Sequence, residues 1–275
     1  MTTFLSSIGS KLAERWASAL LLPGALYLAA VWCAMQLGHR HALDLNLLRP
    51  PFTGSGNHPG AQASIVVGLV LVLLGASAAG LSAQAIGRIV QAVWFGRWRG
   101  PAALLARPLI ALRVAVAVRA ASRAGVTPVA AYLPRRPTAI GEQFRLLEAR
   151  ISAQYHGLRL ALVWPRLWVL LPDGARAPIQ STNNNFHSAA VLTGWGLLYL
   201  VLGAWWFPAA VAGTCAVIAG WLRGRNHAVT LATLIEATVD THLAVLLDAL
   251  NHGLPATGMT GDLAEKINDQ LHKGR

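Results

Sequence analysis

Three long runs of the chain contain no Asp, Glu, Lys or Arg, and they predict where it meets a membrane. They are residues 16–38, 63–87 and 186–222. The last run has 37 residues, and one helix of that length would reach ~55 Å, whereas the hydrocarbon core of a bilayer is ~30 Å thick. It therefore predicts two crossings, 188–204 and 208–222, and a hairpin that dips into the bilayer and returns is the alternative. Trp205-Trp206-Phe207-Pro208 supplies the turn, because indoles favour the membrane interface and proline suits the first turn of a helix.

The first two runs predict another transmembrane hairpin within residues 1–87. Its helices are expected at about 16–37 and 63–87, joined by an external loop, 38–62, that is rich in Pro and Gly. A secretory signal is the alternative for the first run. The apolar core of such a signal has ~7–15 residues, whereas this run has 23, so we expect a retained first helix.

Small residues recur at helical spacing in the second half of the 63–87 helix. Ala79, Ala83 and Gly87 fall on one ridge, and Ala76 and Gly80 fall on another. Such ridges let two membrane helices approach closely. They predict packing against another helix of the same chain, and the seam of a homo-oligomer is the alternative.

Positive charge is concentrated in residues 88–187. This section has 14 Arg against three acidic residues, a net charge of +11 out of +12 for the chain. The 38–62 loop has only Arg40 and Arg49. Because cytoplasmic segments next to membrane helices carry excess Lys and Arg, we expect a multi-pass protein of the cell membrane with 88–187 and both termini in the cytoplasm.

The basic section is expected to lie at the membrane surface. From Pro108 to about Gly125 the pattern predicts an interfacial amphipathic helix, in which Arg113, Arg119 and Arg123 project within a ~120° arc. Their expected partners are anionic lipid headgroups, which are nearer to membrane helices than any nucleic acid, so no nucleic-acid partner is expected. The same headgroup contact is expected for Trp94, Arg97, Trp98 and Arg99.

The sequence after residue 137 predicts shorter elements. Thr138 can cap a helix that continues to about His156. Residues 158–179 alternate briefly and contain Pro172-Asp173-Gly174, which predicts a small β-hairpin, with an interfacial segment as the alternative.

In the near-neutral C-terminal section, 223–275, Arg223 and Arg225 are expected to end the fourth crossing. Asn226 is expected to begin a further helix that ends before Gly253. Acidic residues share one face of that helix, and we expect this face either to dock on the Arg-rich section or to be solvated. They are Glu236, Asp240 and Asp248.

Candidate chemistry is sparse. The chain is 55% hydrophobic and 12% charged, against ~25% charged residues in soluble domains. Cys33 and Cys215 lie in apolar runs and form no disulfide framework, while the loop histidines lack acidic or thiol partners at ligand spacing. We therefore expect no catalytic, cofactor-binding or metal-binding residue, and no enzyme. The loop histidines are His39, His41 and His58. Residues 254–258, LPATG, match the sorting signal that sortases read, but the apolar segment that must follow such a signal is missing, so we expect a chance match.

Three stretches carry a resemblance to a known group. They are VWPRLWVLLPD at 163–173, GWGLLYLVLGAWWFPAA at 194–210 and EATVDTHL at 236–243. In these the chain resembles uncharacterised multi-pass membrane proteins of high-GC actinobacteria, over about residues 158–250. The resemblance implies a topology and a host but no activity. A continuous helix into the third crossing would be expected from it, and Pro178 and Asn183-Asn184-Asn185 interrupt that helix.

The expected fold is mainly α: a polytopic membrane protein with four transmembrane helices in two hairpins, interfacial helices and one small cytoplasmic β-hairpin. The first hypothesis for its function is a non-enzymatic anchor or regulatory subunit for a cytoplasmic partner, because site chemistry is lacking. An oligomeric effector that permeabilises the bilayer is the alternative, suggested by the small-residue ridges. A small transporter component is the third, disfavoured because the membrane runs contain no charged residue.

Overall fold

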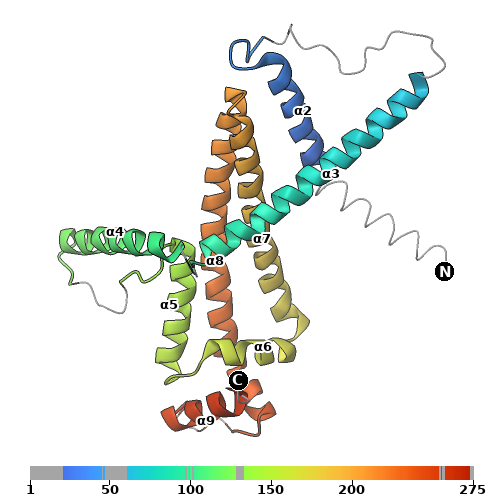
Figure 1. The fold of residues 1–275 in the computed structure, drawn as a ribbon. Helices are drawn as coiled ribbons and strands as arrows, with labels where there is room; N and C mark the ends of the chain where they lie inside the picture. The colour runs from blue at the N-terminus through green and yellow to red at the C-terminus, as the bar shows by residue number, and fades with distance from the viewer. Residues whose placement is uncertain are drawn as a thin grey trace, which may run out of the picture. The chain divides into compact units, whose positions relative to one another are not determined.

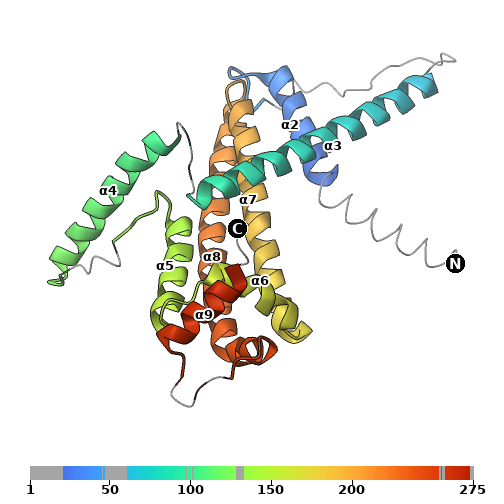
Figure 2. The same cartoon turned by 60° about the horizontal axis from the view of Figure 1, so that its bottom comes forward.

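The computed structural model is all-helical over the residues that it describes (Figures 1 and 2). These are 21–44, 46, 61–96, 98, 100, 102–127, 133–253, 255 and 258–272. Eight helices and no strand occur among them. The helices are α2 (Leu22–Leu37), α3 (Ala61–Trp94), α4 (Ala102–Arg123), α5 (Ala139–Gln154), α6 (Leu160–Leu170), α7 (Asp173–Leu202), α8 (Phe207–Ala249) and α9 (Gly261–His272).

The chain divides into two compact units, each described separately below. Unit 1 comprises Met1–Val90 and Ala189–Trp221. Unit 2 comprises Gln91–Ser188 and Leu222–Arg275. Helices α3, α7 and α8 contribute residues to both units.

Among the described residues, three helices are long and apolar enough to cross a membrane, where the sequence predicted four. They are Val66–Trp94, Asp173–Leu202 and Phe207–Ala249. The predicted first crossing, 16–37, lies partly outside the described residues, and its described part is the 16-residue helix α2. At ~1.5 Å per residue α2 reaches ~24 Å, which is shorter than a ~30 Å hydrocarbon core. The structure therefore does not support the fourth crossing.

The hairpin formed by α7 and α8 turns where the sequence predicted, but both helices are longer than expected. The turn lies between Leu202 and Phe207, and Pro208 is in the first turn of α8. Arg223 and Arg225 do not end α8, because arginine is a good helix former and its charge ends an apolar run, not a helix. Likewise, α7 continues through Pro178 and the three asparagines without a break.

Unit 1 is held together by close helix crossings. A Cβ on Gly194 of α7 would lie 2.5 Å from the carbonyl oxygen of Ala83 of α3, so this crossing requires glycine. A Cβ on Gly24 of α2 would likewise collide with the backbone of Ala76. Beside the α7–α8 turn, the Trp206 indole donates to the Ala42 carbonyl at 2.9 Å. Small residues thus allow α2 and α7 to approach α3 closely.

Unit 2 has a hydrophobic core of its own. Residues of α7 and α8 outside the uncharged run 186–222, among them Ile179 and Leu231, form part of it, and α5, α6 and α9 supply the rest. Four different helices each contribute a fully enclosed side chain: Ile151, Leu167, Leu247 and Ile267. A hydrogen bond also joins α9 to α6, because the Arg166 guanidinium donates to the Leu271 carbonyl at 3.0 Å. Helices α5, α6 and α9 therefore form a packed helical domain with parts of α7 and α8, whereas none of the described side chains of α4 belongs to this core.

The predicted β-hairpin at 158–179 is wrong. Residues Leu160–Leu170 form α6, and Asp173 is the first residue of α7. Alternation over Leu158, Leu160 and Leu162 was too short to specify a strand, whereas Val163 and Leu167 follow the helical period and are buried. The Pro-Asp pair that resembled a turn is equally a helix start, since an acidic residue favours the first turn.

Candidate functional site

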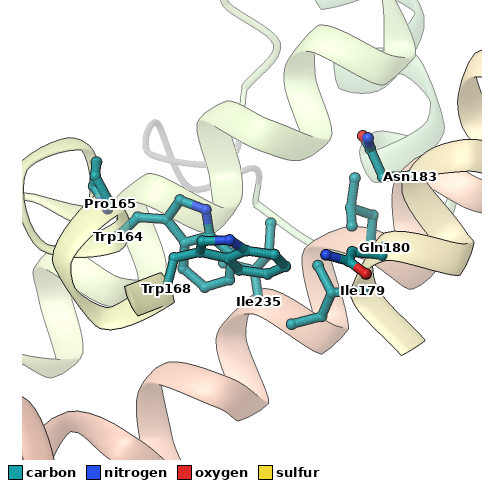
Figure 3. A pocket seen from close by; sticks show the side chains of 8 residues that line it. Trp164, Pro165, Trp168, Ile179, Gln180, Asn183 and Ile235 are labelled. Atoms are coloured by element: carbon teal, nitrogen blue, oxygen red, sulfur yellow. The ribbon is translucent and has the colours of Figure 1, made fainter. Parts of the chain in front are cut away.

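A groove of about 460 Å³ lies between α6, α7 and α8 within unit 2 (Figure 3). This volume is within the range of ~300–1,000 Å³ that is typical of small-molecule pockets. Helix α6 supplies an aromatic wall, and α7 and α8 supply the floor and the opposite wall. The lining residues are Trp164, Pro165, Trp168, Ile179, Gln180, Asn183, Leu231 and Ile235.

The spacing of two tryptophans on α6 builds the aromatic wall. Trp164 and Trp168 are four residues apart, so they project from the same side of the helix. Their ring centroids are 5.8 Å apart with an angle of 44° between the planes. Val163 and Leu167, one position earlier in each turn, are buried in the core and fix the rotation of α6.

The opposite wall combines apolar and carboxamide groups. Ile179 and Leu231 are buried, whereas Gln180 and Asn183 are exposed. The Gln180 carboxamide points toward the indoles, and that of Asn183 points away from them (Figure 3). No titratable side chain is among the residues that line this groove. The groove can therefore accept an apolar group and hydrogen-bond to its polar edge, but it offers no acid, base or nucleophile.

Beside the groove, polar pairs hold α5 on the acidic face of α8. The Arg150 guanidinium donates to both carboxylate oxygens of Glu236, at 2.7 to 3.1 Å. The Tyr155 hydroxyl donates to Asp240 at 2.7 Å. Burial, that hydrogen bond and the Asp240 charge raise the pKa of Tyr155. Glu236 and Asp240 therefore dock on the Arg-rich section, which is the first of the two outcomes expected for this acidic face.

A buried carboxylate organises the start of α5. Glu142 accepts the backbone N–H groups of Arg135 and Arg136 at 2.9 and 2.8 Å, and the Arg145 guanidinium at 2.7 Å. Burial alone would raise the pKa of Glu142, but these three donors and the Arg145 charge outweigh it and lower the pKa. Thr138 caps α5 as predicted, accepting the Gly141 N–H at 3.1 Å.

The residues predicted to contact lipid headgroups do not share one surface. Trp94 is buried and packs against Phe186, with ring centroids 5.7 Å apart. The Trp98 indole donates to the Val93 carbonyl at 3.0 Å. Arg113 is half-buried and donates to the Arg136 carbonyl at 2.7 Å, whereas Arg119 and Arg123 are exposed. Arg97 and Arg99 lie outside the described residues.

The small residues of the predicted ridges are largely covered inside unit 1. Ala76, Gly80, Ala83 and Gly87 are buried, and Ala79 is half-buried. A Cβ on Gly87 would lie 3.1 Å from the Cα of Val191, so α7 covers this end of the ridge.

The remaining sequence candidates lie apart from the groove. Within the described part of the chain, no three His, Cys, Asp or Glu side chains are grouped as metal ligands would be. His58 and part of the LPATG segment lie outside that part. The groove itself was missed, although Trp164 and Trp168 at helical spacing were a readable signal, because 158–179 was interpreted as a strand region.

Comparison of the chain with protein-family models, with curated proteins and with solved structures finds no match. The fold and the groove therefore define only a class: a protein whose described part is all-helical, with three helices able to span a membrane and a packed helical core in unit 2.

Proposed function

We propose that this chain is a non-enzymatic integral protein of the cell membrane that anchors unit 2 in the cytoplasm and presents it to a protein partner. The observation that carries the proposal is the continuity of α7 and α8. Each combines an apolar segment of the uncharged run 186–222 with residues of the unit 2 core. The same two helices thus serve as membrane hairpin and as domain scaffold.

The charge of the 88–187 section supports the orientation. Its net +11 favours the cytoplasmic side, which puts the α7–α8 turn outside and the C-terminus inside. With three crossings, the segment before α3 lies outside. The cytoplasmic N-terminus expected from the sequence would need a fourth crossing, of which only Leu22–Leu37 is described.

The partner would bind at the groove. Two half-buried indoles at a surface are typical of sites where a protein partner buries apolar side chains. The exposed amides of Gln180 and Asn183 would hydrogen-bond the backbone of the inserted segment. A groove without charged lining favours an uncharged, apolar segment of the partner.

Site-specific photo-crosslinking in cells tests this proposal. A photoreactive residue at Asn183 should form one major adduct with another protein, and Trp168→Ala should abolish it. A photoreactive residue at the exposed Glu265 on α9, and the exposed-turn variant Trp205→Ala, are the controls. The absence of an adduct at Asn183, or an adduct that Trp168→Ala leaves unchanged, would contradict the proposal.

Burial of the small-residue ridges weighs against the oligomeric effector, because its expected seam is covered by α2 and α7. Dye release from liposomes that carry the purified protein separates the two functions. The anchor should release no dye. Release by a defined oligomer would favour the effector.

A further inference from the structure

Helix α4 has one half-buried face and one exposed face. Half-buried residues recur every three or four positions, so they share one side of the helix. They are Ala103, Ala106, Ile110, Arg113, Val114, Ala117 and Ala121. Large apolar residues lie outside this stripe, and Leu104, Leu112 and Val116 are 69%, 61% and 56% exposed. Such a row of exposed apolar side chains is typical of a surface that is covered by something else.

The exposed face is also strongly basic. Arg107, Arg119 and Arg123 are exposed, and no ion pair engages them among the described residues. The 97 residues from 45 to 141 contain no Asp or Glu at all. Arg113 differs from these three, because it turns inward to the Arg136 carbonyl. The ligand of the exposed face must therefore be anionic and must also bury leucine and valine side chains.

We propose that this face of α4 binds the surface of an anionic bilayer. Leu104, Leu112 and Val116 would enter the boundary between headgroups and acyl chains, and the three exposed arginines would contact phosphates. A nucleic acid would satisfy the arginines but would leave the apolar side chains in water. Helix α3 ends at Trp94, eight residues before α4 begins, and a linker of that length spans at most ~28 Å. The α3 crossing thus keeps α4 within reach of the bilayer surface.

A fluorescent probe on α4 tests the contact in the full-length protein. Cys33→Ala and Cys215→Ala give a cysteine-free background, and Leu112→Cys is then labelled with bimane. The protein is placed in nanodiscs that contain a nitroxide-labelled lipid, made of phosphatidylcholine alone or with phosphatidylglycerol. We expect bimane quenching to be at least about twofold stronger in the anionic discs, because lipid charge strengthens interfacial binding.

Matched charge variants locate the effect. Arg119→Gln with Arg123→Gln should remove the difference between the two lipids. Arg159→Gln with Lys266→Gln removes the same charge from exposed positions elsewhere in unit 2 and should leave the difference intact. Bimane at Glu265→Cys should not be quenched in either disc.

Three results would overturn the proposal. They are equal quenching at position 112 in the two lipids, no quenching at position 112, or quenching at position 265 as strong as that at position 112. Unchanged circular dichroism of the charge variants shows that they remain folded. The proposal does not depend on the protein partner proposed above, because that partner is absent from the nanodiscs and the groove residues are not altered.

Discussion

The close crossing of α7 and α8 near the middle of the hairpin should not tolerate one added methyl group. A Cβ on Gly213 would lie 2.7 Å from both the Gly196 carbonyl oxygen and the Leu200 nitrogen. Ordinary van der Waals contacts of a Cβ are 3.4–4 Å, so Gly213→Ala forces the helices apart. Overpacking of this kind costs about 1–3 kcal/mol.

Gly174→Ala is the matched control. Gly174 is in the first turn of α7, and no atom lies within 4 Å of its added Cβ. Both substitutions gain up to ~1 kcal/mol of helix propensity, so the difference between them isolates the collision. We expect Gly213→Ala to be less stable than Gly174→Ala by about 1–3 kcal/mol.

Unfolding in mixed micelles, with a rising mole fraction of sodium dodecyl sulfate, measures this difference by tryptophan fluorescence. The midpoint for Gly213→Ala should fall at a lower mole fraction than that of Gly174→Ala. Equal midpoints, or a higher midpoint for Gly213→Ala, would refute the close crossing.

Three further predictions concern unit 2. Arg150→Ala should lower the free energy of unfolding, measured by thermal unfolding, through the loss of the ion pair with Glu236, but by only about 1 kcal/mol because the pair is partly exposed. Adding Glu236→Ala should then lower this free energy little further, and additive losses from the two substitutions would argue against coupling. Because the pKa of Glu142 is lowered on folding, its stabilisation is present above the ordinary carboxyl pKa and is lost as the pH falls through the folded pKa. The free energy of unfolding of the wild type should therefore decrease as the pH falls over that acid range, Glu142→Gln should flatten the dependence, and parallel pH curves would contradict the assignment. Ile267→Ala, at a fully enclosed position of α9, should cost about 2–5 kcal/mol and speed proteolysis between α8 and α9, whereas unchanged protease resistance would show that α9 is not part of the core.

Local signals in the sequence predicted the elements that depend on neighbouring residues. The turn around Trp206 and the cap at Thr138 were predicted because each uses the chemistry of a few adjacent side chains. Long apolar runs likewise identified α3, α7 and α8 as helices able to span a membrane.

The sequence was less informative about where helices end. Arg223 marks the end of an apolar run, but α8 continues for 26 further residues, to Ala249. That continuation is stabilised by contacts with α5, α6 and α9, which are remote in sequence. Tertiary packing of this kind cannot be read from local pattern alone.

The groove shows the same limit. Its eight lining residues come from three helices, and the separation from Trp164 to Ile235 is 71 residues. The sequence could have identified Trp164 and Trp168 as one helical face. It could not have shown that Gln180 and Asn183 lie opposite them.

The most direct test of the account is cysteine accessibility on the two sides of the α7–α8 hairpin. In the cysteine-free background, Trp205→Cys in the turn and Glu265→Cys on α9 are treated in intact cells with a membrane-impermeant thiol reagent. We expect labelling at 205 in intact cells and at 265 only after permeabilisation. Labelling at 265 in intact cells, or no labelling at 205, would contradict a hairpin that crosses the bilayer and holds unit 2 in the cytoplasm.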